Sequence, residues 1–80
     1  MEIKILGGGC PKCKRLEALT REVVEELGIK ATFTKVKQMS DIMSYDVMTT
    51  PALVVNEQVL SSGRIPSHDE IRVWLKSLKN

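Results

Sequence analysis

The hydrophobic residues of this chain follow two different periods, which predict alternating strands and helices. Four short runs rich in apolar and β-branched residues predict strands, at residues 2–6, 29–36, 52–55 and 58–61. Three stretches with apolar residues at helical spacing predict helices, at residues 11–27, 41–45 and from residue 68 onward. The predicted order is β-α-β-α-β-β-α. A strand–helix–strand unit of this length favours a parallel strand pair joined by a right-handed crossover.

Several residues at the ends of these runs support the predicted boundaries. Gly28 follows the first helix and is expected to end it as a left-handed C-cap. Ser67 and Glu70 have the spacing of a capping box, which predicts the start of the last helix. Asn56 and Glu57 are expected to form a two-residue turn, so that the third and fourth strands pair antiparallel.

The short middle helix is less strongly marked than the other two. Ser40 is expected to be its N-cap, because serine accepts hydrogen bonds from the first free N–H groups of a helix. We expect Ile42, Met43 and Val47 to contact the core. Tyr45 is assigned to packing at the rim of the core in preference to the active site, because most aromatic side chains simply bury area.

The composition is that of an ordinary soluble globular protein, and 80 residues predict a single domain spanning residues 1–80. The net charge of +2 is too small to argue for nucleic acid. No apolar run is long enough to cross a membrane, and the first residues lack the basic region and cleavage site of a signal peptide. We therefore expect a cytoplasmic protein with no nucleic-acid or membrane partner. Nothing in the sequence demands a dimer, and we expect a monomer.

The two cysteines, Cys10 and Cys13, lie at the junction of the first strand and the first helix. A helix start has unpaired N–H groups and a positive dipole end, which stabilise a thiolate at Cys10. Pro11 suits the first helical position, and Lys12 adds positive charge. These effects are expected to lower the pKa of Cys10 below about 8.5, and the spacing allows a disulfide with Cys13. Cys10 is therefore the candidate attacking thiol and Cys13 the candidate resolving thiol.

A Cys-x-x-Cys pair also occurs in zinc sites, metal-transfer loops and structural disulfides. Zinc usually needs four protein ligands, or three plus water. Beside the cysteines only His68 and carboxylates could supply them, so we expect no closed zinc site in the chain. A structural disulfide closing so small a loop would restrain the unfolded chain little. The context favours a redox-active pair, with transfer of a soft metal as the alternative.

Three stretches of the chain resemble the thioredoxin fold in its small, glutaredoxin-sized form. They are residues 8–13 with the Cys-Pro-Lys-Cys motif, residues 45–55 with Thr-Thr-Pro, and the turn at Gly63. More narrowly, they resemble the small redox-active disulfide proteins of microbes. The resemblance implies an α/β fold with a four-stranded mixed sheet flanked by three helices. It also implies a cis peptide bond before Pro51, which faces the dithiol and holds the Thr50 backbone where an extended substrate segment can pair with it.

The chain departs from the best-known members of this superfamily at several positions. Gly9 stands where thioredoxin has a tryptophan, and Ile3 and Ile5 supply no acid beneath the dithiol. Lys12 replaces the tyrosine of glutaredoxin. Asp46 occupies a position that is often glycine in relatives, and aspartate tolerates the left-handed conformation better than most residues.

Together the residues and the resemblance predict a thiol-disulfide oxidoreductase that reduces or exchanges protein disulfides. The expected site residues are Cys10 and Cys13 for catalysis through a redox-active disulfide, Pro11 and Lys12 for thiolate stabilisation, and Thr50 and Pro51 for substrate binding. The expected partners are disulfide-containing proteins and an unidentified disulfide reductase that donates electrons. No cofactor or metal is expected. Two alternatives remain: a Cu(I) carrier that uses both thiolates, and a redox-inactive domain that binds partners at the Thr50–Pro51 edge.

Overall fold

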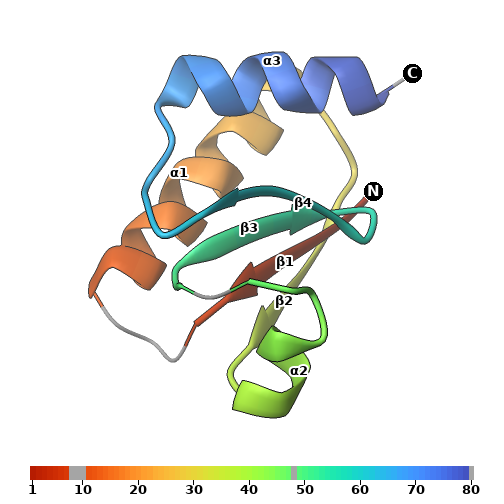
Figure 1. Cartoon of the computed structure of the whole chain (residues 1–80). Coiled ribbons are helices and arrows are strands. Elements are labelled where there is room, and N and C mark those ends of the chain that lie inside the picture. The colour runs from red at the N-terminus through yellow and green to blue at the C-terminus, as the bar shows by residue number, and fades with distance from the viewer. Residues whose placement is uncertain (8–10, 48, 80) are drawn as a thin grey trace.

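The computed structural model describes residues 1–7, 11–47 and 49–79 of the chain. Seven elements follow one another in the predicted order (Figure 1). They are β1 (Glu2–Leu6), α1 (Pro11–Leu27), β2 (Thr32–Val36), α2 (Met39–Met43), β3 (Ala52–Val55), β4 (Gln58–Ser62) and α3 (His68–Lys79). Within the described ranges, no helix is both long and apolar enough to cross a membrane.

The four strands form one mixed sheet in the order β2-β1-β3-β4. β1 pairs parallel with β2 and antiparallel with β3, and β3 pairs antiparallel with β4. Helices α1 and α3 cover one face of the sheet, and α2 lies on the other (Figure 1). The expected fold class, a four-stranded mixed sheet flanked by three helices, is confirmed.

Two clusters of buried side chains hold these layers together, because alternate residues of a strand point to opposite faces of the sheet. The larger cluster lies between the sheet and helices α1 and α3, and its buried members are Ile3, Ile5, Leu16, Val23, Val24, Leu53, Val55, Ile71 and Leu75. The smaller cluster lies under α2, and its buried members are Leu6, Ile42, Val47, Ala52 and Val54. β3 contributes to both clusters and is buried along its whole length, which explains its unbroken apolar sequence.

Helix α1 begins and ends where the sequence predicts, and α3 begins where it predicts. Gly28 has φ +66°, and the N–H of Ile29 donates to the Val24 carbonyl at 3.0 Å, so the left-handed cap of α1 is confirmed. The capping box is confirmed before α3. The N–H of Ser67 donates to Glu70 Oε1 at 3.1 Å, and the N–H of Glu70 donates to Ser67 Oγ at 3.1 Å.

The predictions for the short middle helix are partly wrong. α2 begins at Met39, two residues earlier than predicted, and Gln38 precedes it without a capping side-chain hydrogen bond. Ser40 therefore lies inside the helix and is not its N-cap. Ile42 and Val47 are buried as expected, but the side chain of Met43 is 62% exposed. The second strand is also shorter than predicted, because its pairing with β1 begins at Thr32.

The tight turns of the chain use residues in the left-handed conformation. Asn56 and Glu57, which join β3 and β4, have φ values of +50° and +67°, as a two-residue hairpin turn requires. The Asn56 side chain accepts a hydrogen bond from the N–H of Glu2 at 2.9 Å, which ties this hairpin to β1. Asp46 has φ +60°, so the expectation that it adopts the left-handed conformation is confirmed.

Candidate functional site

The candidate site lies where β1 ends and α1 begins. Cys13 is in the first turn of α1, and 4% of it is exposed. Pro11 is the first residue of that helix, and both Pro11 and Lys12 are exposed. Cys10, the predicted attacking thiol, lies outside the described residues, as do Gly8 and Gly9. Its predicted relation to the helix start and to Lys12 therefore stays a prediction.

Gly7 joins two parts of the site that are far apart in the sequence. Its φ is +146°, and a Cβ atom built on it would overlap Cys13 Sγ and lie 3.6 Å from Thr50 Cβ. The N–H of Gly7 also donates to the Val36 carbonyl at 2.8 Å, which fixes the end of β1 against the end of β2. Gly7 therefore lies close to both Cys13 and Thr50, and the overlap with Cys13 Sγ means that only a residue without a side chain fits there.

The loop before β3 completes this end of the sheet. The Thr50–Pro51 peptide bond is cis, as the family resemblance implies, and Pro51 is fully buried. The Pro51 carbonyl accepts a hydrogen bond from the N–H of Gly63 at 2.9 Å. A Cβ atom on Gly63 would overlap the hydroxyl of Thr49. The structure thus brings the predicted residues Cys13, Thr50 and Pro51 together with the Gly63 turn.

A hollow of about 90 Å³ opens beside Cys13. Its lining residues come from the end of β1, from α1, and from β2 and the segment after it: Ile5, Gly7, Cys13, Lys14, Glu17, Lys35 and Lys37. Glu17 pairs with Lys35 at 3.2 Å and with Arg21 at 3.0 Å. Burial of Glu17 raises its pKa, but the hydrogen bonds from Lys35 and Arg21 outweigh this effect, so the pKa lies below its ordinary value of 4.5. Glu17 therefore stays ionised at neutral pH.

The sequence did not predict this hollow or the contribution of Lys35 and Lys37 to it. Lys35 is more than twenty residues from Cys13 in the chain, and only the parallel register brings it beside the site, where it pairs with Ile5 across the β1–β2 ladder. Lys37 follows directly after that strand. The sequence evidence that could have indicated these lysines was a basic residue at the carboxyl end of the predicted second strand.

The side chain of Tyr45 packs against the core, so the preference for a packing role is confirmed. It packs against the smaller core cluster, and its hydroxyl accepts a hydrogen bond from Lys4 Nζ at 2.7 Å. The same hydroxyl lies 3.1 Å from Glu57 Oε2. Hydrogen bonds from Lys4 to Glu57, and then to Tyr45, raise the pKa of Lys4 above its ordinary value of 10.5. These residues form a polar cluster on the α2 face of β1.

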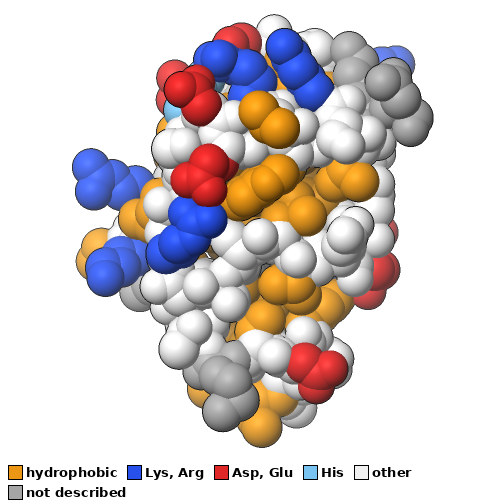
Figure 2. Space-filling model, turned by 45° about the horizontal axis from the view of Figure 1, so that its top comes forward, with side chains coloured by type: hydrophobic (Ala, Val, Ile, Leu, Met, Phe, Trp, Pro, Cys, Tyr) orange, Lys and Arg blue, Asp and Glu red, His pale blue; other side chains and the backbone are white. Residues whose placement is uncertain are grey.

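An apolar hollow of about 200 Å³ lies on the other side of Thr50, next to α2. Its lining residues are Met39, Ile42, Met43, Val47 and Thr50. Met39 and Met43 are 67% and 62% exposed, unusually high for large hydrophobic side chains. Figure 2 shows one face of the molecule, on which hydrophobic side chains lie between groups of charged ones.

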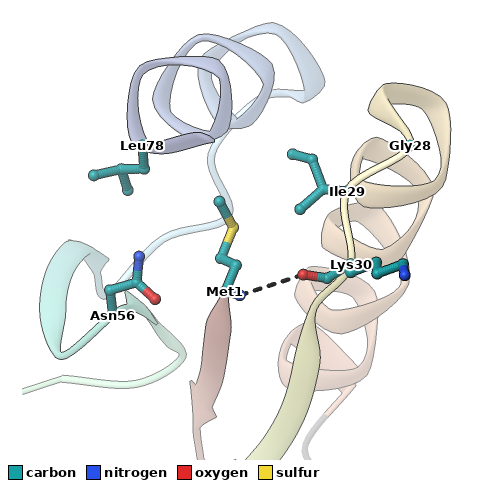
Figure 3. A pocket seen from close by; sticks show the side chains of 6 residues that line it. All are labelled: Met1, Gly28, Ile29, Lys30, Asn56 and Leu78. Carbon is teal, nitrogen blue, oxygen red and sulfur yellow. Dashed lines mark hydrogen bonds between the residues drawn. The ribbon is translucent and has the colours of Figure 1, made fainter. Parts of the chain in front are cut away.

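A larger hollow, about 320 Å³, lies at the start of β1, whereas Cys13 lies near the end of that strand; Figure 3 shows this hollow. Met1 and Asn56 line it together with the loop after α1, and the amino group of Met1 donates to the Lys30 carbonyl at 3.3 Å. Neither Cys13 nor the Thr50–Pro51 loop lines it, so the size of a hollow does not identify the reactive site. Among the described residues, no group of three histidine, cysteine or acidic side chains is arranged to hold a metal ion.

Comparisons with known proteins agree with this geometry. The family model for the thioredoxin domain matches residues 1–76. A thioredoxin of Methanothermobacter thermautotrophicus is 42% identical over 72 residues, which cover 90% of this chain and 94% of that protein. A thioredoxin of Methanocaldococcus jannaschii is 40% identical over 75 residues, covering 94% of this chain and 86% of that protein.

Solved structures show the same fold. Reduced Escherichia coli glutaredoxin superposes with a TM-score of 0.62 at 22% identity, over the whole of both chains. Thioredoxin 1 of Thermosipho africanus gives a TM-score of 0.59 at 17% identity, again over the whole of both chains. The chain therefore belongs to the thioredoxin domain family, a family of thiol-disulfide oxidoreductases.

Proposed function

We propose that this protein reduces or exchanges the disulfides of protein substrates through Cys10 and Cys13. The observation that carries the proposal is the position of Gly7 in a member of the thioredoxin domain family: a Cβ atom added there would overlap Cys13 Sγ and lie 3.6 Å from Thr50 Cβ. One sulfur of the motif therefore lies near the loop whose backbone is proposed to bind substrate.

The proposed reaction has two exchange steps. The Cys10 thiolate attacks one sulfur of the substrate disulfide, forms a mixed disulfide, and releases the other sulfur as a thiolate that takes up a proton. The Cys13 thiol then loses its proton to solvent, and its sulfur attacks Cys10. This step forms the Cys10–Cys13 disulfide and releases the second substrate thiolate. Two electrons pass from the dithiol to the substrate, and a disulfide reductase restores them.

The remaining predicted residues support these steps. Pro11 and Lys12, together with the start of α1, stabilise the Cys10 thiolate. Thr50 and Pro51 hold an extended substrate segment by backbone pairing, so that its disulfide is presented to Cys10. The protein acts as a monomer in the cytoplasm.

Insulin reduction with dithiothreitol as the electron donor tests the roles of the two cysteines. Cys10→Ser is expected to abolish turnover, because the attacking sulfur is gone. Cys13→Ser is expected to accumulate mixed disulfides with substrate, because the resolving sulfur is gone. Ser77→Ala, on α3, is the matched control and is expected to retain full activity. Undiminished activity of Cys10→Ser would overturn the proposal.

A redox titration against thiol buffers, followed by alkylation and mass spectrometry, separates the proposal from its alternative. A reversible two-electron couple between about −270 and −200 mV supports the oxidoreductase. A cysteine pair that resists oxidation but binds Cu(I) tightly would favour the soft-metal carrier instead.

A further inference from the structure

The hollow beside Cys13 is lined by charged side chains that take no part in the proposed exchange reaction. Three lysines surround it, and each comes from a different part of the fold: Lys14 from α1, Lys35 from β2, and Lys37 from the segment after β2. Lys14 and Lys37 are exposed, and the side chain of Lys35 is 52% exposed. Three positively charged residues therefore line a cavity that is also lined by the proposed resolving cysteine.

Glu17 is the acidic residue of this lining, and its charge is already compensated. Its Oε1 atom lies 3.2 Å from Lys35 Nζ, and its Oε2 atom lies 3.0 Å from Arg21 Nη2. Arg21 is itself held over the ring of Phe33, 4.3 Å from the ring centroid. Arg21 balances the negative charge of Glu17. The Glu17 carboxylate therefore positions Lys35 at the hollow without cancelling the positive charge of all three lysines.

The lysines can bind an anion in addition to these contacts. An ammonium has three N–H donors, so a lysine that pairs with one carboxylate oxygen retains capacity for a further acceptor. The cavity of about 90 Å³ holds roughly three molecules at the volume of liquid water, about 30 Å³ each. That space suits a single anionic group of a few atoms and is too small for a folded or helical segment of protein.

We propose that this hollow binds the anionic group of a small disulfide or thiol, which carries a carboxylate, sulfonate or phosphate close to its sulfur. The anionic group would lie among Lys14, Lys35 and Lys37, with the sulfur beside the cysteine pair. The inference rests on the proposed function, because it assumes that the pair exchanges disulfides. It extends that function to a class of small substrates or reductants.

The test compares the reduction of small disulfides that differ mainly in charge. The set is neutral 2-hydroxyethyl disulfide, dicationic cystamine, dianionic 3,3′-dithiodipropionate and dianionic bis(2-sulfoethyl) disulfide. At low ionic strength we expect kcat/KM to be highest for the dianions and lowest for the dication, and salt should reduce the difference. The two dianions distinguish carboxylate from sulfonate, and competition by inorganic phosphate tests the third group.

Substitutions of single lysines test whether the preference for dianionic disulfides arises at this hollow. Lys35→Met and Lys37→Met are each expected to lower kcat/KM for the preferred dianion by up to about fivefold (~1 kcal/mol), with the neutral disulfide unaffected. Lys30→Met and Lys76→Met are the matched controls, because each removes the same charge without touching the hollow. Lys35→Arg retains the charge and is expected to retain the preference. An equal loss in the control variants would mean that net charge, and not this hollow, selects the anion, and would overturn the proposal.

Two further outcomes are decisive. If the wild-type protein reduces the neutral and dianionic disulfides equally well at low salt, the subsite is wrong while the proposed function stands. If no small disulfide reacts, titration with adipate, an unreactive dicarboxylate, followed by backbone amide NMR provides a second measurement. Shifts confined to residues 13–17 and 35–37 would support the subsite, and unchanged spectra would overturn it.

Discussion

The backbone of Gly7 lies directly against the sulfur of Cys13, so closely that a Cβ atom at position 7 would overlap Sγ. The same Cβ position would lie 3.6 Å from Thr50 Cβ, an ordinary van der Waals contact. The end of β1 therefore lies close both to Cys13 and to the loop that contains Thr50. The φ of Gly7, +146°, is also a conformation that residues with side chains rarely adopt.

Gly7→Ala is therefore expected to destabilise the protein by about 1–3 kcal/mol, through backbone strain and overlap with the sulfur. The free energy of unfolding in urea measures this effect. Gly28→Ala is the matched control, because Gly28 also has a positive φ but nothing lies within 4 Å of its added Cβ atom. Its loss should be the smaller of the two, about 1 kcal/mol. Equal losses at the two positions would show that the contact with Cys13 contributes nothing.

Gly63 repeats this arrangement at the turn that holds the Thr50–Pro51 loop. Its φ is +74°, and an added Cβ atom would overlap the Thr49 hydroxyl. We expect Gly63→Ala to lower the free energy of unfolding by more than Gly28→Ala does. Combining it with Thr49→Ala should recover part of the loss, because the overlapping hydroxyl is removed. A double-mutant cycle in urea measures this coupling, and strictly additive losses would contradict it.

The long helices could be predicted from the sequence because residues at their ends leave little choice. Pro11 and Gly28 bound α1 through local backbone preferences, and Ser67 begins α3 through a hydrogen bond that needs only its own helix. The start of α2 has no comparable capping residue. The helix spans five residues, Met39–Met43. A helix this short has too few turns to define a buried face, so the prediction that Met43 is buried failed.

The residues of the candidate site also divide into those that local sequence motifs predict and those whose position depends on the folded sheet. Cys13 and the Thr50–Pro51 loop could be predicted because their motifs are local and ordered along the chain. Gly7 was part of a run of three glycines, and the sequence alone could not show which of them meets the sulfur. Lys35 reaches the site only through the register of β2 on β1, where it pairs with Ile5. Such register depends on the whole folded sheet and has no local sequence pattern.

The ion pair of Glu70 with Arg64 predicts a specific loss of stability in acid. The Arg64 side chain, at 2.8 Å and 3.1 Å, and then the N–H of Ser67, lower the pKa of Glu70 from 4.5 to about 2. A carboxylate with a lowered pKa in the folded state stabilises the protein above its unfolded pKa. This contribution is lost as the pH falls, here from 4.5 towards 2.

Glu70→Gln tests this prediction because glutamine also completes a capping box but carries no charge. The variant should be less stable than the wild type at neutral pH, and its free energy of unfolding should change less between pH 4.5 and pH 2. Arg64→Gln should flatten the profile similarly, and the double variant should add little. Unfolding in urea at several pH values measures these slopes. A Glu70→Gln profile parallel to that of the wild type would mean that other carboxylates determine the acid sensitivity.

Ser61 on β4 carries a buried hydroxyl for which the described part of the chain offers no hydrogen-bond partner. The residue is 8% exposed and lies opposite Leu53 in the sheet. Burying a hydroxyl without a partner is unfavourable by about 1–3 kcal/mol. Ser61→Ala removes the hydroxyl and leaves almost the same shape, so it should raise the free energy of unfolding by about 1 kcal/mol.

Ser62→Ala is the matched control for this prediction, because Ser62 is the next residue of the same strand and is exposed. Its effect should stay within about 0.5 kcal/mol of zero. Thermal and urea unfolding of the two variants side by side separates the buried hydroxyl from the general effect of alanine in β4. A loss of stability in Ser61→Ala that exceeds the change in Ser62→Ala would show that the hydroxyl of Ser61 is bonded in solution. The β3–β4 hairpin would then be stabilised by a polar contact, in addition to its apolar packing.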